Sequence, residues 1–140
     1  MKAANRKDPI VTARETYTVG EEVAIQAPAE EPPYSVVFED DGETGYLYAL
    51  DNKRKGNPIV DAMLIYNAAQ ITDRHKPCLL EVVWSGDSLV SVLFINRHPH
   101  AVVDFGARRA CCRTGFPPPR DDWTSSDHMW DDKLLEKLGL

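Results

Sequence analysis

Two histidines and two cysteines are the side chains of this sequence whose types and spacing best suit metal binding or nucleophilic catalysis. His98 and His100 flank one residue in a stretch with strand character, so their rings would point to the same face of a sheet. Cys111 and Cys112 follow further along the chain. A zinc site needs four ligands, and no Cys-x-x-Cys or His-x-x-x-His pair completes the set. A small hydrolase or a metal-dependent enzyme using these residues remains an alternative hypothesis.

Other recognisable catalytic motifs are missing from the sequence. It contains no Gly-x-Ser-x-Gly nucleophile elbow, no phosphate-binding glycine loop and no His-Glu-x-x-His zinc motif. A chain with 4 histidines and 3 cysteines offers many cysteine–histidine pairs, so such a pair alone selects no nucleophile. We therefore name no catalytic residue, predict no cofactor and no metal, and favour a function other than catalysis.

An acidic turn is the clearest structural signal in the chain. Asp41-Gly42 lies between two runs with strand character, 34–38 and 46–50, and glycine supplies the positive φ that a tight hairpin turn needs. The spacing of the carboxylates around the turn lacks the glycine and the bidentate glutamate of a calcium-binding loop. They are either a solvated turn or an acidic patch that faces a partner protein.

Trp123 follows three successive prolines and lies among aspartates, which makes it the best candidate for an exposed aromatic anchor. Aromatic side chains rimmed by charge are typical of protein interfaces, and docking onto the protein's own sheet is an equal alternative. Arg108, Arg109 and Arg113 are expected to pair with the acidic C-terminal segment, residues 121–132. We expect the residues that bind a partner to be exposed together on one side of the molecule. These predicted residues are Glu39, Asp40, Asp41, Glu43 and Trp123.

The hydrophobic pattern divides the chain into strand-like runs and one helical stretch. Apolar residues at Ile59, Met63 and Tyr66 have the spacing of an amphipathic helix, which we expect from Pro58 to Ala69. Strands are expected at 10–19 and 23–26, and a three-stranded antiparallel meander at 78–84, 89–95 and 100–106. Leucines after Asp131 predict a short final helix over 132–138.

These elements predict an α+β fold. It would contain a mainly antiparallel sheet of roughly five to seven strands, one long helix packed on a face of the sheet, and a short C-terminal helix. The length of 140 residues suits a single domain over 1–140, in which residues 1–8 form a disordered tail.

The bulk composition limits the classes of function. A net charge of −6 argues against a nucleic-acid binder and suits a cationic protein partner. No run of about 18 apolar residues is present, and no apolar signal-peptide segment follows the basic N-terminus. The cysteines are expected to be reduced thiols. We predict a cytoplasmic protein, monomeric or homodimeric, that binds neither nucleic acid nor membranes.

Three stretches of the sequence resemble a family of small bacterial proteins with a domain of unknown function: 38–51, 59–67 and 95–109. The resemblance runs from about Val19 onward. It implies a bacterial origin and a single intracellular domain, and it carries over no catalytic residues. In size, charge and composition the chain is also similar in general character to immunity proteins, which neutralise the toxins of competing bacteria.

Three functions follow from these observations. The leading prediction is a cytosolic protein-binding module, in its most specific form an immunity protein that holds a cationic toxin through the acidic hairpin and Trp123. The alternative is the small hydrolase or metal-dependent enzyme described above. The third is a small-ligand-binding domain, with an apolar pocket between helix and sheet lined by Tyr46, Tyr48 and Tyr66.

Overall fold

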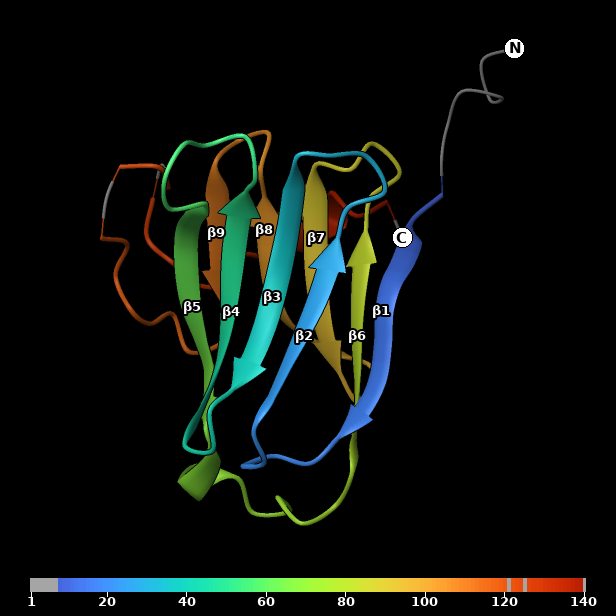
Figure 1. Cartoon of the computed structure of the whole chain (residues 1–140), viewed down its shortest axis with the longest axis vertical. Coiled ribbons are helices and arrows are strands. Elements are labelled where there is room, and N and C mark those ends of the chain that lie inside the picture. Colours follow the sequence, from blue (N-terminus) through green and yellow to red (C-terminus); the bar gives the residue numbers. More distant parts are fainter. Residues whose placement is uncertain (1–7, 121, 125, 140) are drawn as a thin grey trace.

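The computed structural model describes residues 8–120, 122–124 and 126–139, and these residues form two antiparallel sheets packed face to face (Figure 1). The five-stranded sheet has the order β1-β6-β7-β8-β9, and the four-stranded sheet has the order β2-β3-β4-β5. The strand bounds are β1 (Ile10–Tyr17), β2 (Val23–Pro28), β3 (Tyr34–Asp40), β4 (Thr44–Asp51), β5 (Ile59–Asn67), β6 (Cys78–Trp84), β7 (Val90–Ile95), β8 (His98–Asp104) and β9 (Arg109–Cys112). This architecture is a β-sandwich. The tail predicted at residues 1–8 lies outside the described residues except for Asp8.

The hairpin and the meander predicted from the sequence are confirmed. β3 pairs with β4 from Tyr34 opposite Asp51 to Asp40 opposite Gly45, and Gly42 at their turn has a φ of 100°. β6, β7 and β8 pair in succession as antiparallel neighbours. The strands expected near the N-terminus are β1 and β2. Turn residues and period-two alternation were therefore sufficient to locate these strands.

The long helix expected from Pro58 to Ala69 is wrong, and with it the α+β fold class. Residues Ile59–Asn67 form β5, which pairs with β4 and is followed by a 3₁₀ turn at Ala68–Gln70. The side chains of β5 are largely buried on both faces, and its free edge is covered where Leu64 N donates to Phe116 O at 2.8 Å. A strand that is apolar on both faces loses its alternation, so its apolar positions can match helical spacing.

The core between the sheets contains a stack of aromatic rings. Phe105 stacks on Tyr34 with 4.4 Å between ring centroids and on Trp84 with 5.5 Å. Trp84 is fully buried, and its Nε1 donates to Ala27 O of the opposite sheet at 3.2 Å. The two sheets are therefore joined by a hydrogen bond as well as by apolar burial.

The segment that follows β9 covers the outer face of the five-stranded sheet. Leu134 and Leu138 are buried there against Val92 and Val102. Helix α1 (Asp132–Glu136) begins after Asp131, whose side chain accepts from Lys133 N at 2.9 Å, so the predicted short C-terminal helix is confirmed. Within the described ranges, no helix combines the length and the apolar character needed to cross a bilayer.

Candidate functional site

The outer face of the four-stranded sheet is the open face of this sandwich. In Figure 1 the strands β2 to β5 lie in front and no other described element crosses them, whereas α1 lies behind the five-stranded sheet. Val36, Phe38 and Leu47 point into the core, so the residues that alternate with them point outward. The outward side chains at the centre of this face are Val37, Glu39, Tyr46, Tyr48 and Leu50. All five are half-buried or exposed, so apolar and aromatic surface remains accessible here.

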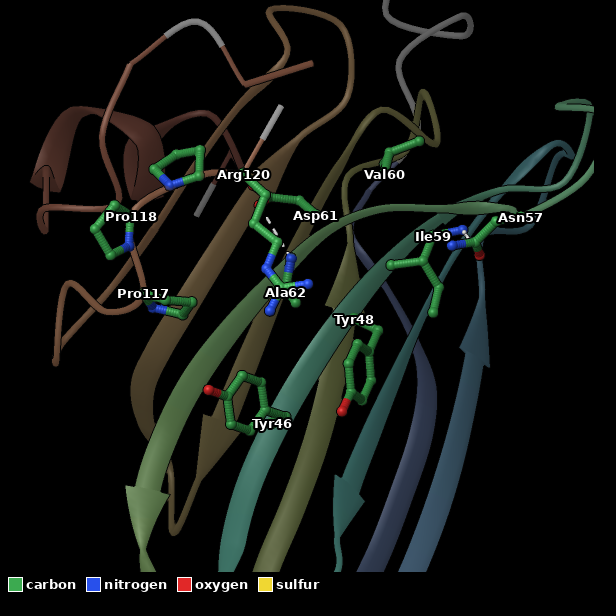
Figure 2. A pocket seen from close by; sticks show the side chains of 11 residues that line it. Tyr46, Tyr48, Asn57, Ile59, Val60, Asp61, Ala62, Pro117, Pro118 and Arg120 are labelled. Carbon is green, nitrogen blue, oxygen red and sulfur yellow. Dashed lines mark hydrogen bonds between the residues drawn. The ribbon is translucent and has the colours of Figure 1, made fainter. Parts of the chain in front are cut away.

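A groove of about 450 Å³ lies on this face, between β4, β5 and the segment 117–120 (Figure 2). Tyr46 and Tyr48 project from β4 along one wall. Pro118 and Arg120 belong to the opposite wall, and the Arg120 side chain extends toward Ala62 of β5. The groove therefore combines aromatic rings, prolines and a cation, which suits the binding of a chain segment or a ligand of mixed polarity.

The two tyrosines of the groove form a stacked pair. Their ring centroids are 5.8 Å apart and their planes differ by 19°. Glu39 of the neighbouring strand lies opposite Tyr46 in the register. Partial burial raises the pKa of Tyr48, and the nearby negative charge of Glu39 raises it further. The Tyr48 phenol is therefore protonated at neutral pH and can donate a hydrogen bond.

A buried ion pair holds the proline wall against the sheet. Asp61 on β5 lies with Oδ2 at 2.8 Å from His128 Nε2, and its side chain is 5% exposed, while that of His128 is 0% exposed. Thr124 Oγ1 donates to the same carboxylate at 2.6 Å. The other ring nitrogen, Nδ1, is hydrogen-bonded to Pro117 O, the first residue of the wall.

This geometry defines the protonation state of His128. Both ring nitrogens face acceptors, a carboxylate and a carbonyl, so both must carry a proton. Burial alone would lower the pKa of His128, but the hydrogen bond and charge of Asp61 and the Pro117 carbonyl together raise it. His128 is thus a charged structural clamp. It has no free nitrogen with which to accept a proton from a substrate.

This clamp was not predicted from the sequence, although one signal for it was present. Asp61 is a charged residue within the apolar run 59–66, and a carboxylate in such a run requires a buried partner. That requirement could have been recognised, but the partner could not, because His128 and Thr124 come from the distant C-terminal segment.

The acidic hairpin residues separate into an exposed set and a buried one. Glu39, Asp41 and Glu43 are exposed as expected. Asp40 is 1% exposed, which corrects the expectation that it lies on the surface. Its carboxylate accepts from Gly20 N and Gly42 N, both at 2.8 Å, and from Tyr66 Oη at 2.6 Å. The buried Asp40 therefore links the turns at Gly20 and Gly42 to Tyr66 in the core.

Trp123 is also buried, at 8% exposure, so it does not form the exposed aromatic anchor that we expected. Its ring packs edge-on against Phe105 with 5.8 Å between centroids, and the Arg108 guanidinium lies 5.8 Å above it. Of the three arginines expected to pair with the acidic C-terminal segment, Arg109 does so in the described residues, with Nη2 at 3.3 Å from Asp131 Oδ2, whereas Arg113 lies over the Trp130 ring. Asp121 of that predicted acidic set lies outside the described residues. Docking onto the protein's own sheet is the alternative that holds for Trp123.

Within the described residues, no hydrogen bond joins the two histidines of the enzyme hypothesis to its two cysteines. The rings of His98 and His100 meet edge to face at 5.4 Å, and burial, followed by the charges of His98 and Arg113, lowers the pKa of His100 to about 4. Cys111 lies under the C-terminal segment, where burial raises the pKa of its thiol, and Cys112 points to the opposite side, into the core. All three cysteines are free thiols. In the part of the chain that the structure describes, no three His, Cys, Asp or Glu residues gather as a metal site.

The pocket expected between helix and sheet is absent, because the helix is absent. Tyr46 and Tyr48 line the groove on the open face, but Tyr66 points into the core, where its hydroxyl lies 3.0 Å from that of Tyr17. The three tyrosines therefore do not line a common pocket.

Comparison with known proteins places the chain in a bacterial family. Residues 17–139 match the model of a family described as an uncharacterized protein conserved in bacteria (DUF2251). An uncharacterized protein of Haemophilus influenzae is 42% identical over 86 residues, which cover 61% of this chain and 53% of that relative. The chain thus matches about half the length of this relative. No solved structure gives a significant match. Since the family match covers nearly the whole chain and confirms the resemblance noted from the sequence, the protein belongs to the DUF2251 family of uncharacterised proteins conserved in bacteria.

Proposed function

We propose that this protein is a binding module that holds another protein on the open face of its four-stranded sheet. The observation that carries this proposal is the contrast between the two outer faces. The chain's own C-terminal segment covers the apolar outer face of one sheet, while the Tyr46–Tyr48 pair and its apolar neighbours on the other have no such cover. Exposed apolar patches of this kind mark interaction sites.

The chemistry of the face suits a protein partner. Tyrosine combines a large apolar ring with a polar hydroxyl and loses little conformational freedom on binding, so it is enriched at the centres of protein interfaces. The groove is open along one side and long enough to span parts of β4 and β5, a shape that suits an extended segment of another chain. The ion pair under its proline wall keeps the groove formed in the absence of a partner.

Neutralisation of a toxin in the cytoplasm is the more specific form of this proposal. It is supported by the net charge of −6, by the exposed carboxylates Glu39, Asp41 and Glu43 beside the tyrosines, and by the three free thiols, which suit a reducing compartment. A small acidic protein can associate rapidly with a basic one through such charges.

Site-specific photo-crosslinking in cells of the source bacterium tests the binding face. Tyr48 is replaced by p-benzoylphenylalanine, and Val11, which is 41% exposed on β1 of the other sheet, is replaced as the control position. The proposal predicts a discrete adduct with one protein from position 48 and not from position 11. A Tyr46→Ser change beside the probe should abolish the adduct. Equal adducts from both positions, or none from position 48, would contradict a binding role for this face.

A further inference from the structure

We infer that the segment bound on this face carries a lysine or arginine, and that its cation lies over the Tyr46 and Tyr48 rings beside Glu39. This inference rests on the proposed function, because it assigns the chemistry of the partner at the same face. It also sets the orientation of the bound segment. Arg120 lies on the opposite wall of the groove, so the basic group of the segment should face the tyrosines and not that wall.

The tyrosine pair and the neighbouring Glu39 together favour a bound cation. Tyr46 and Tyr48 offer two nearly parallel ring faces with 5.8 Å between their centroids. Glu39 lies directly opposite Tyr46 across the β3–β4 ladder, so a carboxylate is next to the rings. Ring faces attract cations through their quadrupole, and an adjacent carboxylate adds a full negative charge. A guanidinium or ammonium group matches both features at once.

Charge is distributed unevenly between the two ends of β4. Within the described residues, none of Glu39, Asp41 and Glu43 forms an ion pair with a basic side chain, so their charges act outward at the hairpin end of β4. Lys53 and Lys55 follow the other end of β4 and are exposed. A basic group in the partner is therefore favoured at the hairpin end of the face and disfavoured at the other end.

The partner segment is held through side chains of the sheet face. The free edge of β5 is taken by the chain itself, because Leu64 N donates to Phe116 O and Thr114 Oγ1 donates to Leu64 O at 2.7 Å. The wall that follows is formed by prolines, which have no backbone N–H to offer a strand. Addition of the partner as a further strand is therefore blocked on this side, and recognition must come from side chains on the sheet face.

A matched pair of peptides tests the inference directly. The probes are a blocked Pro-Arg-Pro tripeptide and its citrulline counterpart, in which a neutral urea replaces the guanidinium. Each is titrated into isotopically labelled full-length protein, and the NMR signals of Tyr46 and Tyr48 are followed to saturation. The arginine peptide should bind at least about fivefold more tightly than the citrulline peptide at low salt, because only the former carries a charge.

Two variants identify the source of the difference. Glu39→Gln should clearly lower the affinity ratio of the two peptides, because the tyrosine rings alone would then favour the cation. Glu15→Gln, which removes an exposed carboxylate from β1 in the other sheet, should leave the ratio unchanged. Equal binding of both peptides to the wild-type protein, or a ratio that Glu39→Gln leaves unchanged, would overturn the inference. The proposed function would still stand if position 48 gave its crosslinked adduct, so the two failures are distinguishable.

Discussion

Asp61 binds the imidazole of His128 with both carboxylate oxygens, at 2.9 Å from Oδ1 and 2.8 Å from Oδ2 to Nε2, although the residues are 67 positions apart. Asp61 lies near the start of β5, and His128 belongs to the covering C-terminal segment. Because His128 also bonds the carbonyl of Pro117, this ion pair fixes the position of the groove wall relative to the sheet. The stability of the fold and the shape of the groove are therefore coupled through one histidine.

Replacing His128 by asparagine should remove a pH-dependent part of the stability. A histidine whose folded-state pKa is raised stabilises the fold fully below its unfolded pKa of about 6.5, and this contribution is lost as the pH rises through the folded pKa. Asp127 adds a weaker effect of the same sign as Asp61. Urea unfolding of both proteins between about pH 5 and about pH 9 should show their free-energy difference shrinking as the pH rises. A difference that is constant with pH would contradict a charged clamp.

His100 should show the opposite behaviour. Its pKa is lowered to about 4 by burial and by the neighbouring His98 and Arg113, so its NMR titration should have a midpoint near that value. The unfolded chain then binds a proton more readily than the folded one, and stability falls as the pH drops from about 6.5 toward the folded pKa. A His100→Gln variant should lose this acid-side slope. A midpoint near the ordinary histidine value would show that the ring is solvated.

Asp40→Asn should destabilise the protein by about 2 kcal/mol, because a buried N–H donor would lose its acceptor. The two carboxylate oxygens of Asp40 accept from Gly20 N, Gly42 N and Tyr66 Oη, and an amide offers an oxygen on one side only. Glu43→Gln is the matched control on the exposed part of the same turn, and we expect a change below about 0.5 kcal/mol there. The free energies of unfolding from urea titration measure both. Similar losses in the two variants would argue against the internal role of Asp40.

Gly45→Ala should destabilise the fold by about 1 to 3 kcal/mol, because the new methyl group would overlap a buried ring. A Cβ at Gly45 would lie 2.7 Å from Cζ of Tyr66, its partner in the β4–β5 register. The cost should fall in a Tyr66→Leu background, in which the ring is gone. A double-mutant cycle on the free energies of unfolding measures this coupling. Additive effects would show that another neighbour is responsible.

The predictable part of the fold is the part whose signals are local. The Asp41-Gly42 turn and the alternation from Cys78 onward specified the β3–β4 hairpin and the β6–β8 meander, because each depends on residues adjacent in sequence. β5 was missed because its burial is decided by segments far along the chain. The short strand β9 was missed for a similar reason, since its Arg109 and cysteines carry no alternation until β8 is placed beside them.

The candidate site was predictable only in pieces. The exposure of Glu39, Asp41 and Glu43 follows from the turn, and Tyr46 and Tyr48 were recognised as candidate pocket residues. Asp40 alternates with exposed carboxylates, so its inward direction required the strand register. The groove itself exists only because Pro117–Arg120 return to the edge of β5, and no local pattern in either stretch indicates that encounter.

The cover on the five-stranded sheet has a consequence for biosynthesis. Leu134 and Leu138 are translated after every strand that they cover, so a nascent chain has Val90, Val92 and Val102 bare until they emerge. A nascent chain that stalls before this point would expose an apolar surface, and chaperones and proteases recognise such surfaces. Synthesis of the C-terminal segment is therefore the step that removes this apolar surface from solvent.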